Sequence, residues 1–204
     1  MDQTALVSAQ EVFARRVGPA RGLAEEAERV ARACHAMATR FHSGGRLIVF
    51  GNGEAATDAQ HIAVEFVHPV IVGKRALPSF SLTNDVATVT GIAAAVGADQ
   101  VFAHQLRHLA VHDDIALGVS AYGDCVNVLR ALETAKELGL LTLALVGGDG
   151  GEIMRSVAVD HVLVARSGDP RIVKEVHVTT YHILWELVHV FFEQPGVLDP
   201  QVVA

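Results

Sequence analysis

The stretch RLIVFGNGEAATDAQHIAVEF, residues 46–66, contains an apolar run, a glycine turn and the beginning of a helical segment. Leu47 to Phe50 form a short continuous apolar run, which is typical of a strand covered on both faces. Gly51-Asn52-Gly53 makes the turn, and a helix is expected from about Ala55. In open parallel sheets, ligands bind where such turns follow the carboxyl ends of strands. The stretch therefore predicts an α/β fold with a ligand-facing loop after this strand.

The alternation of apolar strands and helical segments continues along the chain. Further strands are expected at 78–83, 114–120, 140–147 and 160–165, and helices at 85–95, 98–110, 125–138, 151–156 and 173–193. This order predicts a doubly wound, mainly parallel five-stranded sheet flanked by helices. Residues 9–41 are rich in Ala, Glu and Arg, which predicts an N-terminal helical extension broken or kinked near Gly18-Pro19. We expect a single structural domain overall, in which a helical segment, 1–45, packs on the α/β part, 46–204, and on other subunits.

The composition favours a small-molecule or protein partner over other partner classes. Half of the 204 residues are hydrophobic and only 19% are charged, against about 25% in an average soluble domain, so part of the surface is expected to be buried between subunits. The net charge of −7 argues against nucleic acid. The sequence has no apolar run of about 18 residues, so no membrane span is expected. Cys34 and Cys125 lack metal or redox spacing and are interpreted as reduced thiols of a cytoplasmic protein.

The helix after the first turn carries His61 and Glu65, four residues apart and therefore on one face. An imidazole and a carboxylate placed in this way can share a zinc ion. The carboxylate can also take a proton from a carbon next to a carbonyl. The same two residues fit a solvated polar stripe with Thr57, Asp58 and His68. The residues alone leave both interpretations open.

Five stretches of the chain are similar to those of a known family: Gly51-Asn52-Gly53, DAQHIAVE, GVSAYGDCVNVLRALETAKELG, VGGDGG and KEVHVTTYHILWEL. On these stretches the chain resembles the SIS (sugar isomerase) domain family, and within it the bacterial phosphoheptose isomerases. The resemblance implies a flavodoxin-like three-layer sandwich and a homotetramer with sites between subunits. It implies conversion of sedoheptulose 7-phosphate to a heptose 7-phosphate. It also implies a metal, commonly zinc, at His61, Glu65 and His182, with Glu65 as the base and His182 as the acid.

Lys174 is the first departure from the family pattern, since the family has a glutamine ligand there. A protonated lysine has no lone pair for zinc, so zinc is in doubt, and the ammonium is expected to pair with Glu65 in place of the metal. Lys174 lies eight residues before His182, about 12 Å along a regular helix. Both can reach one centre only where the helix starts late or bends.

The phosphate-binding loops of the family are the second departure. Hydroxyl positions of the family are occupied here by Ala121, Tyr122 and Cys125. Asp124 brings a negative charge and is expected to cap the following helix in competition with phosphate. In the first loop, Glu54-Ala55 replaces Gly-Ser. The candidate ligand-binding residues are Asn52, Gly53, Glu54, Ser120, Ala121, Tyr122, Asp124, Cys125 and Lys174.

A third departure is Ala94-Ala95, where the family has an Asn-Asp pair that touches substrate. Three functions therefore remain open. The first is an aldose–ketose isomerase for a phosphorylated sugar. The second is a non-catalytic binding or assembly protein on the SIS scaffold. The third is an enzyme for a non-phosphorylated or cationic ligand attracted to Glu54, Asp124 and Glu65.

Overall fold

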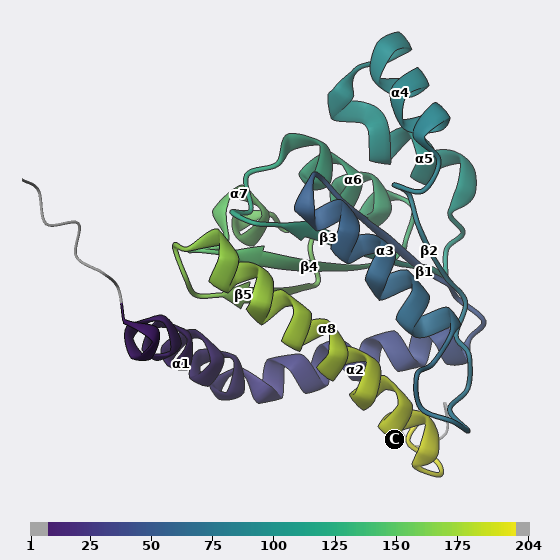
Figure 1. The fold of residues 1–204 in the computed structure, drawn as a ribbon. Coiled ribbons are helices and arrows are strands. Elements are labelled where there is room, and N and C mark those ends of the chain that lie inside the picture. The colour runs from purple at the N-terminus through teal and green to yellow at the C-terminus, as the bar shows by residue number, and fades with distance from the viewer. Residues whose placement is uncertain (1–7, 199–204) are drawn as a thin grey trace, which may run out of the picture.

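The computed structural model describes residues 8–198 and has a five-stranded, fully parallel sheet between two layers of helices (Figure 1). The strand order is β2-β1-β3-β4-β5. The strands are β1 (Leu47–Gly51), β2 (Ser79–Ser81), β3 (Ile115–Ser120), β4 (Leu141–Gly147) and β5 (His161–Ala165). The predicted doubly wound sheet is confirmed, and each strand lies within or next to its expected range.

Alternate side chains of each strand face opposite helical layers. Leu47 and Val49 of β1 join a core with α1 (Ala9–Glu25), α2 (Ala27–His42), α3 (Glu54–Val67) and α8 (Pro170–Glu193). Ile48 and Phe50 join a second core with α4 (Val86–Ala95), α5 (Val101–Leu109), α6 (Val126–Glu137) and α7 (Gly151–Arg155). The short helix η1 (Ala98–Gln100) leads into α5. Among residues 8–198, no helix is long and apolar enough to cross a membrane.

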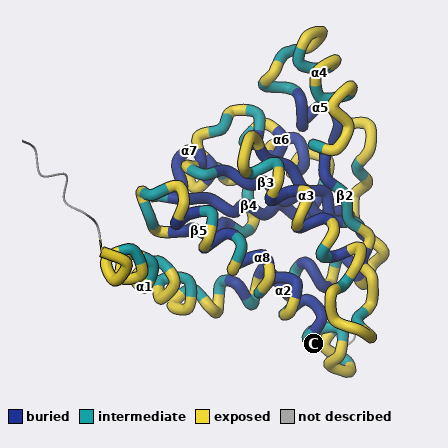
Figure 2. Tube along the Cα trace, in the orientation of Figure 1, coloured by how far each residue is buried: buried dark blue, intermediate teal, exposed yellow. Residues whose placement is uncertain are grey.

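Two helices remain largely uncovered in the single chain (Figure 2). Within their described ranges, neither α1 nor α4 has a buried residue. The sequence of α4 is nevertheless apolar, VATVTGIAAA, and Phe13 and Val17 of α1 are 73% and 52% exposed. Exposed apolar side chains of this kind are typical of surfaces that other subunits cover.

The predicted helix break near Gly18-Pro19 is wrong. α1 continues through Pro19 to Glu25, and the interruption falls at Glu26, where the backbone N–H bonds to the Leu23 and Ala24 carbonyls. Proline removes one helical N–H donor, which frees the carbonyl of Arg15. Arg15 is exposed, so water can hydrate that carbonyl and the helix continues.

Candidate active site

The candidate loops meet because their strands are neighbours in the sheet. Gly51 at the end of β1 pairs with Val119 of β3, and Ser120 pairs with Val146 of β4. The loop after β3 then packs closely on the loop after β4. A Cβ on Gly123, which has a φ of +78°, would lie 2.0 Å from the Gly150 carbonyl oxygen. Only glycine allows the two backbones to approach this closely. The loop after β3 is therefore positioned by backbone contact with the loop after β4.

The first loop is joined to the start of α6. Asn52 Nδ2 donates to Asn127 Oδ1 at 2.7 Å, and Asn127 Nδ2 donates back to Asn52 Oδ1 at 3.0 Å. Gly53 has a φ of +56° and precedes α3, whose first residue is the exposed Glu54. A carboxylate in the first turn is favourable to the helix dipole. The position of Glu54 at the start of α3 is therefore explained by the helix dipole, without a ligand.

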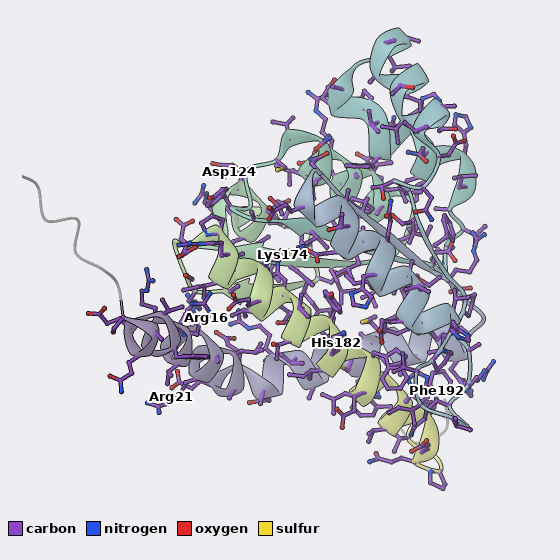
Figure 3. The ribbon with its side chains drawn as sticks, viewed as in Figure 1. Arg16, Arg21, Asp124, Lys174, His182 and Phe192 are labelled. Atoms are coloured by element: carbon purple, nitrogen blue, oxygen red, sulfur yellow. The ribbon has the colours of Figure 1, made fainter. Side chains whose placement is uncertain are left out.

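Asp124 does not cap α6, contrary to expectation. Its Oδ1 accepts a hydrogen bond from the Glu152 N–H at 3.0 Å, close to the start of α7. Figure 3 shows Asp124 beside this helix. The reason is the close packing of the two loops, which carries Asp124 to Gly151: a Cβ on Gly151 would lie 2.3 Å from Asp124 Oδ1. The carboxylate is thus neutralised in part by the α7 terminus instead of the α6 terminus.

The remaining residues of the second loop surround the beginning of α6. Ser120 is buried and its Oγ accepts the Gly123 N–H at 3.0 Å, whereas Tyr122 is 51% exposed. Ala121 and Cys125 are half-buried. Cys125 is the N-cap residue of α6 and makes no side-chain capping bond there. The N–H groups at this helix end are thus suited to an anion.

His61, Glu65 and His182 converge between α3 and α8, which pack side by side. His61 Nε2 lies 3.2 Å from Glu65 Oε1, and His182 Nε2 lies 4.0 Å from the same oxygen. The Glu65 side chain is 12% exposed, while the two imidazoles are each nearly half exposed. A solvated polar stripe on α3 does not account for His182, which lies 117 residues after Glu65 in the sequence and still reaches the same carboxylate.

The three side chains fit a zinc ion. One ligand atom from each lies within 4.8 Å of the other two, so a single ion could lie among all three atoms, which bind zinc at about 2.0–2.2 Å. Two histidines and a glutamate, with a fourth position open, form the donor set of a catalytic zinc site. Within residues 8–198, this group meets the distance requirement for a shared metal.

Lys174 does not pair with Glu65, so this expectation is wrong. Its Nζ lies 2.7 Å from Asp58 Oδ1 and 3.3 Å from the Glu54 carbonyl oxygen. The physical reason is that α8 begins early, at Pro170, with Asp169 as its N-cap. Lys174 and His182 therefore stand on one continuous helix (Figure 3), about 12 Å apart along its axis, and serve different centres.

Three further side chains of α3 and α8 were not predicted as site residues: Asp58, His177 and Tyr181, all of them buried. The Tyr181 hydroxyl lies 2.8 Å from His61 Nδ1. Burial, followed by the charges of Asp58 and Glu65, raises the pKa of Tyr181 to about 12. Burial lowers the pKa of His177, whose Nε2 has no hydrogen-bond partner among the described residues. The sequence spacing could have indicated two of them. Asp58 lies seven residues before Glu65, and Tyr181 lies seven residues after Lys174, so each pair lies on one helix face.

A cavity of about 500 Å³ adjoins Glu65 and His182. Its remaining walls are Val70, Ile71, Lys74, Trp185, Glu186 and Val190. Cavities of about 300–1,000 Å³ are typical of small-molecule sites. Glu65 and His182 thus border a space of the size of a small-molecule site, and His61 contacts Glu65 beside it.

Comparison with known proteins agrees with this geometry. The SIS domain family model matches residues 7–147. The chain is 38% identical over 180 residues to a phosphoheptose isomerase of Desulfovibrio desulfuricans, covering 87% of this chain and 84% of the relative. It is 43% identical over 148 residues to one of Pelobacter propionicus, covering 72% and 77%.

Solved structures show the same similarity. A phosphoheptose isomerase from Francisella tularensis superposes with a TM-score of 0.83 at 29% identity, covering 89% of this chain and 96% of that one. Phosphoheptose isomerase GmhA from Neisseria gonorrhoeae superposes with a TM-score of 0.80 at 27% identity, covering 88% and 95%.

Proposed function

The chain belongs to the SIS domain family, and we propose that it is an aldose–ketose isomerase acting on a phosphorylated sugar of the sedoheptulose 7-phosphate class. The observation that carries the proposal is the convergence of His61, Glu65 and His182 beside a cavity of about 500 Å³. Relatives named phosphoheptose isomerase match most of the chain, which supports this substrate class over the alternatives.

The chemistry is one proton transfer between neighbouring carbons. Glu65 takes the proton from the carbon next to the carbonyl, and the electrons left behind form an enediol. His182, with Nε2 at 4.0 Å from Glu65 Oε1, exchanges protons with the sugar oxygens through the ring nitrogen that does not hold the metal. Glu65 then returns its proton to the other carbon, so no electron acceptor is needed. Zinc held by His61, Glu65 and His182 would polarise the carbonyl as a Lewis acid.

The phosphate is assigned to the loops at the strand ends. The uncapped start of α6 and the turn at Gly53 offer N–H groups there. Gly53 lies eight residues before His61, about 12 Å along the helix, a separation comparable with the length of an extended seven-carbon sugar. The sugar would therefore extend from the loops to Glu65 past the Lys174–Asp58 pair, with its phosphate at the loops and its carbonyl at Glu65. The cavity of about 500 Å³ lies on the other side of Glu65, toward Val70 and Val190.

The working form is proposed to be a cytoplasmic homotetramer in which the helices α1 and α2 also pack on other subunits. Support comes from the exposed apolar surfaces of α1 and α4 in the single chain. Exposed Val70 and Ile71 follow α3 and line the cavity, so a neighbouring subunit would also close the site.

The test is turnover of sedoheptulose 7-phosphate by the purified protein, with zinc and with a chelator. Sedoheptulose without phosphate is the matched control substrate. We expect turnover of the phosphorylated sugar alone, stimulated by zinc. Turnover of both sugars at similar rates would contradict the phosphate assignment, and turnover of neither would contradict the isomerase.

A further inference from the structure

His61 is held between two partners, one at each ring nitrogen. Tyr181 Oη lies 2.8 Å from Nδ1, and Glu65 Oε1 lies 3.2 Å from Nε2. The rings of His61 and Tyr181 pack edge to face, with centroids 5.4 Å apart. Tyr181 is 1% exposed, so its hydroxyl reaches His61 from the core. The orientation of the imidazole is therefore set by two contacts of different chemistry.

The chemistry of these contacts determines the tautomer of the metal-free ring. A carboxylate only accepts hydrogen bonds, so a neutral His61 must donate its Nε2–H to Glu65. Nδ1 then carries the lone pair and accepts the hydrogen bond from the Tyr181 hydroxyl. A cation at the three ligands would need the Nε2 lone pair, which requires the proton on Nδ1. The hydrogen bond to Tyr181 would then reverse, with Nδ1–H donating to the phenol oxygen.

We infer that the Tyr181 hydroxyl is a positioning residue that serves both tautomers of His61 and thereby raises the metal affinity of the His61, Glu65 and His182 site. A hydroxyl is donor and acceptor on one atom, so it can pair with Nδ1 before and after metal binding without moving. Outer partners of metal-bound histidines fix ring orientation and increase ligand basicity. The inference rests on the metal site of the proposed function, and concerns zinc binding rather than turnover.

Tyr181→Phe isolates the hydroxyl from the ring. Phenylalanine keeps the edge-to-face packing on His61 and on His182, whose ring centroid lies 4.8 Å from that of Tyr181. It leaves the Nδ1–H of a metal-bound His61 facing an apolar edge. Loss of such an outer partner typically weakens metal binding about 10–100-fold.

The experiment measures the zinc dissociation constant of the full chain by competition with a chromophoric chelator. The chain has two tyrosines, and Tyr122 is 51% exposed, so Tyr122→Phe is the matched control. We expect about tenfold or greater weakening in Tyr181→Phe and an unchanged constant in Tyr122→Phe. Equal constants for Tyr181→Phe and the unaltered protein would overturn the inference, as would absence of zinc binding to the unaltered protein.

A nitrogen-15 NMR spectrum of the imidazoles reads the tautomer directly, with His61→Ala identifying the His61 signals. We expect the Nε2–H form without zinc and the Nδ1–H form with zinc in the unaltered protein. In metal-free Tyr181→Phe, the Nε2–H form should persist, because Glu65 still accepts from Nε2, while the Nδ1–H form should be harder to populate with zinc because Nδ1–H has lost its acceptor. The same tautomer in both states would overturn the inference. Because neither readout involves a sugar, loss of isomerase activity with intact zinc binding would contradict only the proposed function.

Discussion

Replacement of Lys174 by glutamine separates two roles for the lysine, a structural partner of Asp58 or a substitute for the metal. The Lys174 ammonium lies 2.7 Å from Asp58 Oδ1, and the side chains of Lys174 and Asp58 are 35% and 7% exposed. Breaking a buried pair costs about 3–5 kcal/mol, and an exposed pair contributes about 0–1 kcal/mol. Because only the carboxylate is buried, we expect Lys174→Gln to lower the free energy of unfolding by about 1–3 kcal/mol.

Urea unfolding followed by the fluorescence of Trp185, the single tryptophan, measures this change. All variants are compared at one protein concentration and without metal, since oligomerisation and ligands shift apparent stability. Asp58→Asn and the double variant complete a double-mutant cycle. The double variant should be more stable than the sum of the two single losses predicts, by about 1 kcal/mol or more. Additive losses, or no loss in Lys174→Gln, would refute the pairing.

Zinc affinity of Lys174→Gln provides the second half of this test. The ammonium contacts the first turns of α3, and Asp58 lies seven residues, about 10 Å along the helix, before Glu65. We therefore expect the zinc dissociation constant to change by less than about threefold, or 0.7 kcal/mol. Zinc binding that becomes tenfold tighter would show that Lys174 acts at the metal position.

Four other substitutions test separate features of the fold and the loops. Because burial lowers the pKa of His177 below 6.5, the unfolded chain binds a proton that the folded chain does not. The free energy of unfolding should fall as pH drops below about 6.5, by up to about 1.4 kcal/mol per pH unit, and urea titrations of His177→Gln should lack this component. Gly123→Ala should lower the free energy of unfolding by at least about 2 kcal/mol, because the added Cβ meets the Gly150 carbonyl and the φ is positive. The control Gly22→Ala adds a Cβ in open space on α1 and should raise it by about 0.5–1 kcal/mol. A Gly123→Ala variant more stable than Gly22→Ala would contradict the loop packing. Asp124→Asn keeps an acceptor for the Glu152 N–H but removes a charge, so calorimetry should find phosphate bound about threefold or more tightly, and unchanged affinity would remove Asp124 from the phosphate site.

The fold was predictable because its signals are local. Five apolar runs between helical segments correspond to the five strands, since strands covered on both faces must be apolar throughout. The meeting of the loops after β1, β3 and β4 also followed, because parallel neighbours end at one edge. The position of the break between the N-terminal helices, at Glu26, was not predictable from Pro19. The cost of a proline inside a helix depends on whether the carbonyl that it leaves unbonded can reach water.

The partners of charged side chains were not predictable, because they depend on the register of one helix against another. Asp58 and Glu65 lie on the same face of α3, and the sequence alone does not decide which of them faces Lys174. The early start of α8 at Pro170 places Lys174 beside Asp58 and leaves Glu65 to the histidines. The partner of Asp124 was likewise not predictable, because its contact with α7 depends on how the loops after β3 and β4 pack together.

Turnover by Glu65→Gln is the most direct test of the proposed isomerase. Glutamine has nearly the same shape but cannot take a proton from carbon. With sedoheptulose 7-phosphate and zinc in excess, we predict that kcat falls by about 10²–10⁴-fold, the usual contribution of a general base, while the KM changes little. Turnover at the unaltered rate would show that Glu65 is not the base and would contradict the assignment of the His61, Glu65 and His182 group as the catalytic site.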